Sequence, residues 1–238
     1  MEDVKKHVDA IIENTFAVLP SLYKEGKKSN RKPLSRLIFP KKREEGNDTE
    51  GTENKGETRY SEQELRFLFV EKFNEYIKAH NLDWYYSIET PTILKYSGFS
   101  GSNAKPKVDM DKGQSAMIDL VIFDENIKRI ALIEFKEGNP DLLCFEKDFL
   151  KLKKENKIDR EDNNSYPLTY FVMYIKSYNI SDNESTNDTI KSLTKKIQAK
   201  DNEDHVFKDE RTQFYCYVLE PKEGQQRRIE DLILKSNS

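Results

Sequence analysis

Three charged residues interrupt two hydrophobic segments of this chain. Asp119 lies within AMIDLVIF, whereas Glu134 and Lys136 lie within ALIEFKEG. Both segments are apolar on both faces, which is typical of buried strands, and DENIK between them predicts a tight turn. A charge buried in such a hairpin is costly unless it is paired, so these three positions are the first candidates for chemistry.

The register of the predicted hairpin brings the two acidic residues together. If the turn is centred just after Asn126, Asp119 and Glu134 face each other across adjacent strands, with Cβ atoms about 5 Å apart. Opposed carboxylates repel unless a positive charge lies between them, and a divalent cation meets that need. Oxygen ligands favour Mg²⁺, with Mn²⁺ as the alternative. Lys136 shares a strand face with Glu134, where it could hold an anionic oxygen or activate a metal-bound water.

The Glu-x-Lys spacing is not specific in a sequence this rich in charge, because it occurs five times. Four of the five lie in polar surroundings or span a proline. Only Glu134 and Lys136 are embedded in a predicted buried strand opposite an aspartate. The alternative interpretation of these residues is a structural ion network at the edge of a sheet.

The segment from residue 61 to about residue 80 predicts an amphipathic helix. At about 100° per residue, its apolar positions average to a direction close to that of Glu62, and Arg66 follows one turn later near the same line. Glu62 is therefore a candidate for a further acidic ligand, and Arg66 for a cation near a phosphate. The alternative is an i,i+4 ion pair between the two at the end of the helix. Glu89, in the next predicted strand, is a less favoured candidate for the same site.

Composition and charge narrow the classes of protein. Charged residues make up 35% of the 238 residues and apolar residues 36%, which is enough for one core. The net charge of −3 argues against a globally basic nucleic-acid binder, although local basic patches remain open. Two distant cysteines and three histidines exclude a disulfide framework and a Cys/His zinc site. Without an apolar run that could span a bilayer or a signal peptide, we expect a cytoplasmic protein with no membrane partner.

The hydrophobic periodicity predicts an α/β chain with three parts. These are an N-terminal helix in residues 1–23, a charged flexible linker at 24–58 and a main domain at 59–238. The predicted helices and strands follow in the order helix 3–20, helix 61–80, strands 84–96, 116–123 and 129–135, helix 141–156, strand 166–175, helix 185–199, strand 213–220 and a short helix within RRIEDLILK. Lys151, Lys153 and Lys154 are expected on the exposed face of their helix.

This order and these residues resemble the PD-(D/E)XK nuclease superfamily over residues 60–220. The resemblance implies a restriction-endonuclease-like α-β-β-β-α-β core, with a mixed central sheet flanked by helices and an N-terminal helical extension. It implies a nuclease that hydrolyses phosphodiester bonds, expected to be an endodeoxyribonuclease. It also implies that Asp119, Glu134 and Glu62 bind Mg²⁺ or Mn²⁺, and that Lys136 assists the attacking water. Ile118 stands where the family commonly has a proline, and no Q-x-x-x-Y follows Lys136, so the exonuclease branch is not indicated.

Contacts to the substrate must come from other segments. The loop 98–114 carries Lys105 and Lys107 and could follow a phosphate backbone, as could the basic arm at 24–43. For both segments, a solvated loop is the alternative. The implied partner is nucleic acid, expected to be DNA, and a homodimer follows only by analogy with duplex-cutting relatives. Two other classes are a catalytically silent nucleic-acid-binding or protein-interaction module, and a small-molecule enzyme, which would lack its usual Gly-rich phosphate loop.

Overall fold

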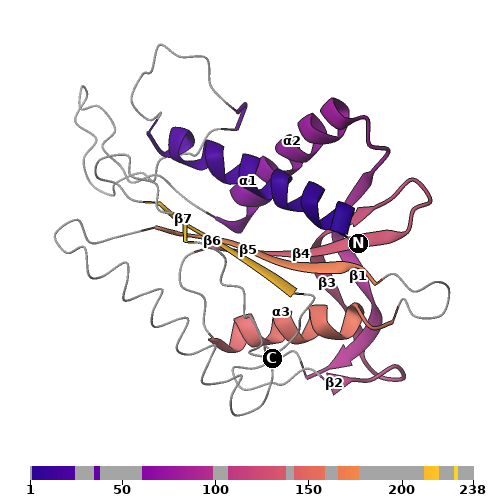
Figure 1. Cartoon of the computed structure of the whole chain (residues 1–238). Helices are drawn as coiled ribbons and strands as arrows, with labels where there is room; N and C mark the ends of the chain where they lie inside the picture. The colour runs from indigo at the N-terminus through magenta and orange to yellow at the C-terminus, as the bar shows by residue number, and fades with distance from the viewer. Residues whose placement is uncertain are drawn as a thin grey trace, which may run out of the picture.

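The fold is built on one mixed β-sheet with helices on both faces (Figure 1). The computed structural model describes residues 2–24, 35–37, 61–98, 107–137, 142–158, 166–176, 212–219 and 228–229. The helices are α1 (Glu2–Lys24), α2 (Glu62–His80) and α3 (Leu142–Glu155). The strands are β1 (Tyr85–Ser97), β2 (Lys107–Val108), β3 (Gln114–Phe123), β4 (Arg129–Glu137), β5 (Leu168–Lys176), β6 (Thr212–Leu219) and β7 (Arg228–Ile229), in the spatial order β2-β1-β3-β4-β5-β6-β7.

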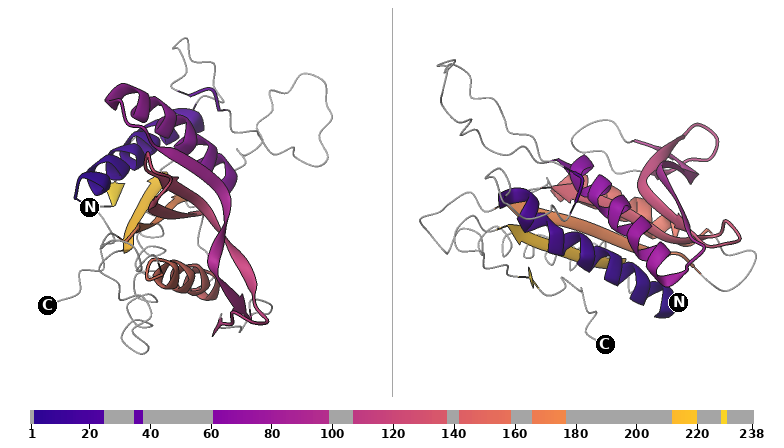
Figure 2. Two further views of the ribbon diagram at one scale, coloured as in Figure 1. Left: turned by 90° about the vertical axis from the view of Figure 1, so that its right-hand side faces the viewer. Right: turned by 90° about the horizontal axis from the view of Figure 1, so that it is seen from above.

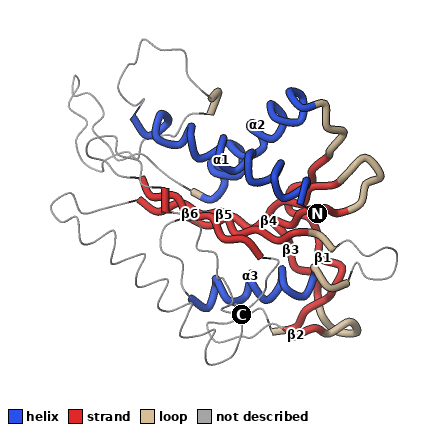
Figure 3. Tube along the Cα trace, in the orientation of Figure 1, coloured by secondary structure: helices blue, strands red, loops and turns tan. Residues whose placement is uncertain are grey.

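The sheet is antiparallel on one side and parallel in its middle. β1, β3 and β4 are antiparallel neighbours, whereas β4, β5 and β6 run parallel to one another. A parallel pair requires a crossover, and α3 lies between β4 and β5 in the chain (Figure 3). Residues 131–136 of β4 are all buried, as expected for a central strand whose sequence is apolar on both faces.

The predicted register of the β3–β4 hairpin is confirmed over its central pairs. The structure pairs Leu120 with Ile133, Val121 with Leu132, and Ile122 with Ala131. The carboxylate of Asp124 holds the turn, because it accepts hydrogen bonds from the backbone N–H groups of Asn126 and Lys128, each at 2.9 Å. Beside the turn the pairing shifts by one residue, because Phe123 lies opposite Arg129 and not opposite Ile130 as a constant register would require.

Helices cover opposite faces of the sheet (Figure 2). On one face, α1 and α2 bury their apolar stripes, and the ring of Phe69 in α2 lies 5.5 Å from the ring of Phe135 in β4. On the other face, the phenylalanines of α3 stack on those of β5 and β6. Because side chains alternate along a strand, Phe135 faces α2 while Glu134 and Lys136 face α3.

The predicted N-terminal helix is confirmed as α1, and it contributes to the same core as the sheet. Val8, Ile11, Ile12 and Leu19 are fully buried among residues of α2 and the strands. Each such side chain contributes about 1.5–3 kcal/mol when it leaves water. Among the helices that the structure describes, none combines the length and the apolar character needed to cross a bilayer.

Three predicted segments lie wholly or mostly outside the residues that the structure describes. The predicted linker at 24–58 and helix at 185–199 lie outside the described residues, except for residues 24 and 35–37. The segment 35–37 docks on α2, where the Ser35 hydroxyl donates a hydrogen bond to Glu71 at 2.9 Å. The short helix predicted within RRIEDLILK is wrong at Arg228 and Ile229, because these residues form β7 and pair with β6.

An irregularity in β1 is held by a glutamate from α3. The β1–β3 register shifts between Pro91 and Lys95, which leaves the backbone N–H groups of Ile93 and Leu94 without strand partners. The buried Glu155 carboxylate accepts both, each at 2.9 Å. Glu155 thus accepts the hydrogen bonds of the unpaired backbone N–H groups in the bulge, and these bonds hold α3 against β1.

Candidate functional site

Asp119 lies where β3 and β4 separate. Their paired register ends at Leu120 and Ile133, so the backbone pairing predicted between Asp119 and Glu134 does not form. Instead, Asp119 Oδ2 accepts a hydrogen bond from the backbone N–H of Phe135 at 2.8 Å. The separation places a carboxylate between the strands, in a position that an uninterrupted ladder would not provide.

Arg66 of α2 binds two carboxylates from different strands. Its Nη2 lies 2.7 Å from Asp119 Oδ1, and its Nη1 contacts Glu89 of β1. Only 9% of Arg66 is exposed, and its Nε has no hydrogen-bond partner. We expected Arg66 to contact a phosphate, or to pair with Glu62. The structure shows a buried fork that orients Asp119.

Glu134 is almost completely buried and faces a lysine from α3. Its exposed fraction is 2%, and its Oε1 lies 2.7 Å from Nζ of Lys151, although without the alignment of a hydrogen bond. The prediction that Lys151 lies on the exposed face of its helix is wrong, because only 5% of it is exposed. The available signal was the i, i+3, i+7 spacing of Asp148, Lys151 and Glu155 along one flank of the apolar stripe.

Lys136 is held by carboxylates from two helices. Its Nζ lies 2.9 Å from Asp148 Oδ2 in α3 and 3.7 Å from Glu62 Oε1 at the start of α2. Burial favours the neutral amine, but Asp148 and Glu134 outweigh it and raise the pKa of Lys136 above its ordinary value. Lys136 therefore stays protonated at neutral pH, which suits a charged donor better than a base that activates water.

The carboxylates of the site are close enough to affect one another. Burial raises the pKa of Glu134 well above its ordinary value, and Asp148 and Asp119 raise it further against the opposing effect of Lys151. Burial also raises the pKa of Glu62, where Asp119 acts in the same direction and Lys136 opposes it. An added positive charge would stabilise the ionised forms of both glutamates.

The charge balance of the site leaves room for a divalent cation. Five carboxylates, those of Glu62, Glu89, Asp119, Glu134 and Asp148, are linked by ion pairs to three cations, those of Arg66, Lys136 and Lys151. The carboxyl groups outnumber the cations by two, and two of them, those of Glu62 and Glu89, belong to side chains that are 41% and 55% exposed. Within the described part of the chain, no three acidic, histidine or cysteine side chains already converge as metal ligands. The residues fit Mg²⁺ or Mn²⁺ in donor type and charge, and the buried Glu134 Oε1 still lacks a hydrogen bond.

Of the two lysines predicted to contact phosphate, only Lys107 is described, and the structure does not bring it to this site. Lys105 lies outside the described residues. Lys107 is exposed in β2, which β1 separates from β3 in the sheet. The structure thus groups Glu62, Arg66, Asp119, Glu134 and Lys136 with Glu89, the less favoured candidate, and adds Asp148 and Lys151 to them.

Asp148 shares its carboxylate between the two buried lysines, so its charge should matter for stability. Its Oδ2 contacts Lys136 and its Oδ1 contacts Lys151 at 3.0 Å. Replacing Asp148 by asparagine is expected to lower the free energy of unfolding at pH 7 by about 2 kcal/mol, because two buried cations lose a counter-charge. Urea denaturation measures this, with the exposed Asp83→Asn as the control.

The effect of Asp148 should also depend on pH. Burial favours its neutral form, but Lys151 and Lys136 outweigh it, so the pKa of Asp148 lies below the ordinary aspartate value. Its contribution is therefore complete above the pKa of an unfolded aspartate and is lost as pH falls through its lowered folded-state value. The difference between the wild type and Asp148→Asn should shrink in strong acid. A difference that stays constant on acidification would contradict this assignment.

Glu89 has a strained backbone within β1. Its φ is +51°, between the regular pairs of Ile88 with Leu120 and Thr90 with Ile118. Such angles are costly for residues with a Cβ, and they tend to occur at functional sites. The strain lies at the residue that contacts Arg66 opposite Asp119.

The strain at Glu89 can be separated from its charge. Glu89→Gly and Glu89→Ala both remove the carboxylate, but glycine accepts positive φ freely. We therefore expect Glu89→Gly to be more stable than Glu89→Ala by about 1 kcal/mol. Ser87 is a regular position of the same strand, so there we expect Ser87→Gly to be less stable than Ser87→Ala. Thermal denaturation of the four variants measures both differences, and the same order at both positions would disprove the strain.

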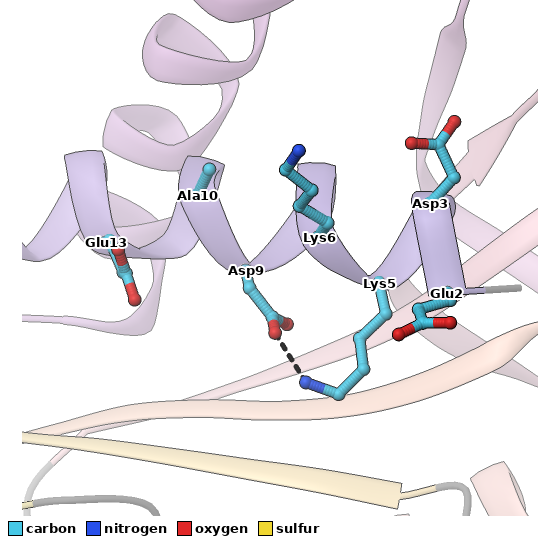
Figure 4. Close-up of a pocket in the computed structure, with 7 residues that line it drawn as sticks. All are labelled: Glu2, Asp3, Lys5, Lys6, Asp9, Ala10 and Glu13. Carbon is cyan, nitrogen blue, oxygen red and sulfur yellow. Dashed lines mark hydrogen bonds and ion pairs between the residues drawn. The ribbon is translucent and has the colours of Figure 1, made fainter.

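A surface pocket along α1 is distinct from this charged cluster. It is lined by Glu2, Asp3, Lys5, Lys6, Asp9, Ala10 and Glu13. Figure 4 shows that these side chains come from one helix and project in different directions, with Lys5 paired to Asp9. This pocket therefore gathers no convergent set of ligands.

Comparison with known proteins does not identify a relative. The chain matches no protein-family model, and no curated protein or solved structure is significantly similar to it.

Proposed function

We propose that this chain is a divalent-metal-dependent nuclease that hydrolyses phosphodiester bonds, with DNA as its substrate and cleavage within the strand. One observation carries the proposal: Asp119 and Glu134 lie at the end of the β3–β4 pairing, in a cluster of five carboxyl groups and three cations that includes the ammonium group of Lys136. Apart from the two-residue strand β2, the elements from α2 to β5 follow the α-β-β-β-α-β order of a restriction-endonuclease-like core, which supports the proposal. A cytoplasmic location and a homodimeric assembly remain predictions.

The residues of the site have separable roles in this proposal. Asp119 and Glu134 would hold the cation, with Glu62 as a third ligand from α2. When bound, the cation would polarise the phosphate and lower the pKa of a water molecule. Lys136 would donate hydrogen bonds to a phosphate oxygen, where its fixed positive charge stabilises developing negative charge. Asp148 and Arg66 would orient Lys136 and Asp119, respectively.

A cleavage assay tests the proposal directly. Supercoiled plasmid, linear duplex, single-stranded DNA and RNA are incubated with the full chain in Mg²⁺, Mn²⁺ or EDTA. We expect nicking or linearisation of the plasmid that requires a divalent cation and is lost in EDTA. Absence of cleavage on all four substrates in both metals would overturn the proposal. Preference for linear ends would replace endonucleolytic with exonucleolytic action.

A second candidate function is a catalytically silent nucleic-acid-binding or protein-interaction module. The observation that favours it is the pairing of Asp119 with Arg66 and of Glu134 with Lys151, which neutralises the carboxylates internally. In that case, a metal would be unnecessary for the fold or for binding. The same incubations distinguish the two, since this module would retain DNA in a gel-shift assay without cutting it and without needing the cation.

A further inference from the structure

The ammonium group of Lys151 has three acceptors around it. Nζ lies 2.7 Å from Glu134 Oε1 and 3.0 Å from Asp148 Oδ1, and it donates a hydrogen bond to the backbone carbonyl of Met117 at 2.6 Å. The contact with Glu134 lacks hydrogen-bond alignment, whereas the other two are hydrogen bonds. Lys151 thus neutralises the charge of Glu134, while Asp148 and the backbone carbonyl of Met117 accept the hydrogen bonds of its ammonium group.

We propose that Lys151 is the internal counter-ion of Glu134 and that a divalent cation binding at Asp119 and Glu134 displaces its ammonium group from Glu134. The inference rests on the proposed metal site and adds a competitor to it. An ionised carboxylate buried to this degree is costly without a positive charge beside it, and in the metal-free protein the ammonium group of Lys151 supplies that charge. Lys151 supplies one charge, and the metal supplies two.

The release of Lys151 from Glu134 has a low cost because its other partners stay in place. Asp148 and the carbonyl of Met117 still accept hydrogen bonds from Nζ after Glu134 turns to the metal. A buried ammonium without such acceptors would lose its solvation entirely and would resist displacement. Lys136 is not the competitor, since its contacts are with Asp148 and Glu62.

Competition of this kind is a negative coupling between two cations at one carboxylate. Removal of the lysine charge should therefore tighten metal binding, and coupling between sites is commonly worth a factor of about 5 to 150 in affinity. We expect Lys151→Met and Lys151→Gln to bind Mn²⁺ about tenfold more tightly than the wild type. Glutamine keeps a hydrogen-bond donor near Glu134, so it tests the loss of charge with less risk to folding.

The measurement is calorimetric titration of the full chain with Mn²⁺ alone, without nucleic acid, with circular dichroism to verify that each variant folds. Lys157→Met is the matched control, because Lys157 is exposed in the turn that follows α3. The affinity of this variant for Mn²⁺ should equal that of the wild type. Unchanged or weaker binding in both Lys151 variants, with normal binding in the wild type, would overturn the inference alone. No Mn²⁺ binding in any protein would overturn the proposed metal site and the inference together.

Lysine ammonium NMR gives a second readout that does not depend on affinity. The Nζ signal of Lys151 is assigned by its absence from Lys151→Gln. Saturating Mg²⁺ should shift this signal more than that of Lys136, because Lys151 loses a contact of 2.7 Å with Glu134, whereas Lys136 keeps its contact of 2.9 Å with Asp148 and has only a 3.7 Å contact with Glu62. A Lys151 signal that is unchanged while Mg²⁺ binds would show that the metal and the lysine do not compete.

Discussion

Replacing Asp119 by asparagine is expected to reduce the rate of metal-dependent DNA cleavage by about 10³-fold. A metal ion in such a site stabilises the transition state by several kcal/mol, and each 1.36 kcal/mol corresponds to about a factor of ten in rate. Asparagine keeps the size of the side chain and can still accept the hydrogen bond from the backbone N–H of Phe135. It loses the negative charge that would bind the cation and that pairs with Arg66.

Single-turnover cleavage of plasmid over a range of Mg²⁺ concentrations measures the effect. The control is Asp111→Asn, which changes an exposed aspartate in the turn before β3 and should cleave at the wild-type rate. Thermal denaturation of both variants separates lost chemistry from lost folding. Cleavage by Asp119→Asn within a few-fold of the wild type, at all Mg²⁺ concentrations, would remove Asp119 from the site.

The largest effect on stability is expected at Glu155. Its side chain is fully buried, and it accepts hydrogen bonds from the backbone N–H groups of Ile93 and Leu94 and from the hydroxyl of Tyr96 at 3.2 Å. Hydrogen bonds to a charged group contribute about 1.5–3 kcal/mol each, and unpaired buried donors are costly. We expect Glu155→Ala to lower the free energy of unfolding by about 4 kcal/mol.

Urea denaturation followed by circular dichroism tests this expectation. Glu125→Ala in the β3–β4 turn is the control, because it removes an exposed glutamate and should cost less than about 0.5 kcal/mol. Glu155→Gln should fall between the two, since an amide oxygen can accept some of the same hydrogen bonds. A loss below about 1 kcal/mol for Glu155→Ala would show that β1 does not depend on this contact. Because Glu155 fastens α3 to β1, its loss should also disturb Asp148 and Lys151 on the same helix.

The secondary structure could be predicted closely because it depends on short-range patterns. The hairpin of β3 and β4 is the clearest case, since its apolar pattern favours the register that pairs Leu120 with Ile133, although the pairing shifts by one residue at Phe123 beside the turn. The same patterns located α1, α2, α3, β5 and β6 to within a few residues. They failed at Arg228 and Ile229, where a helical pattern was overridden by pairing with β6.

The structure brings together five of the predicted residues, Glu62, Arg66, Asp119, Glu134 and Lys136, and pairs them with partners that the sequence did not indicate. The hydrophobic residues around Asp119, Glu134 and Lys136 indicated that these charges are buried. The position of Glu62 on the apolar side of its helix predicted that it points toward the core, and the structure places it 3.7 Å from Lys136. The same reasoning favoured a metal as the charge that relieves the repulsion between carboxylates and kept a structural ion network as the alternative. Lys151 and Arg66 also supply positive charge there, and Lys151 had been expected in solvent.

The sequence by itself determined the elements, the register of the central hairpin and the few charged positions that a core must accommodate, because periodicity and turn chemistry act over a few residues. Only the tertiary structure decided the partners. Asp119 is paired with Arg66 from a helix on one face of the sheet, and Glu134 with Lys151 from the helix on the other. The choice between competing partners depends on distances of a few ångströms between layers packed from distant segments, and no local pattern encodes those distances.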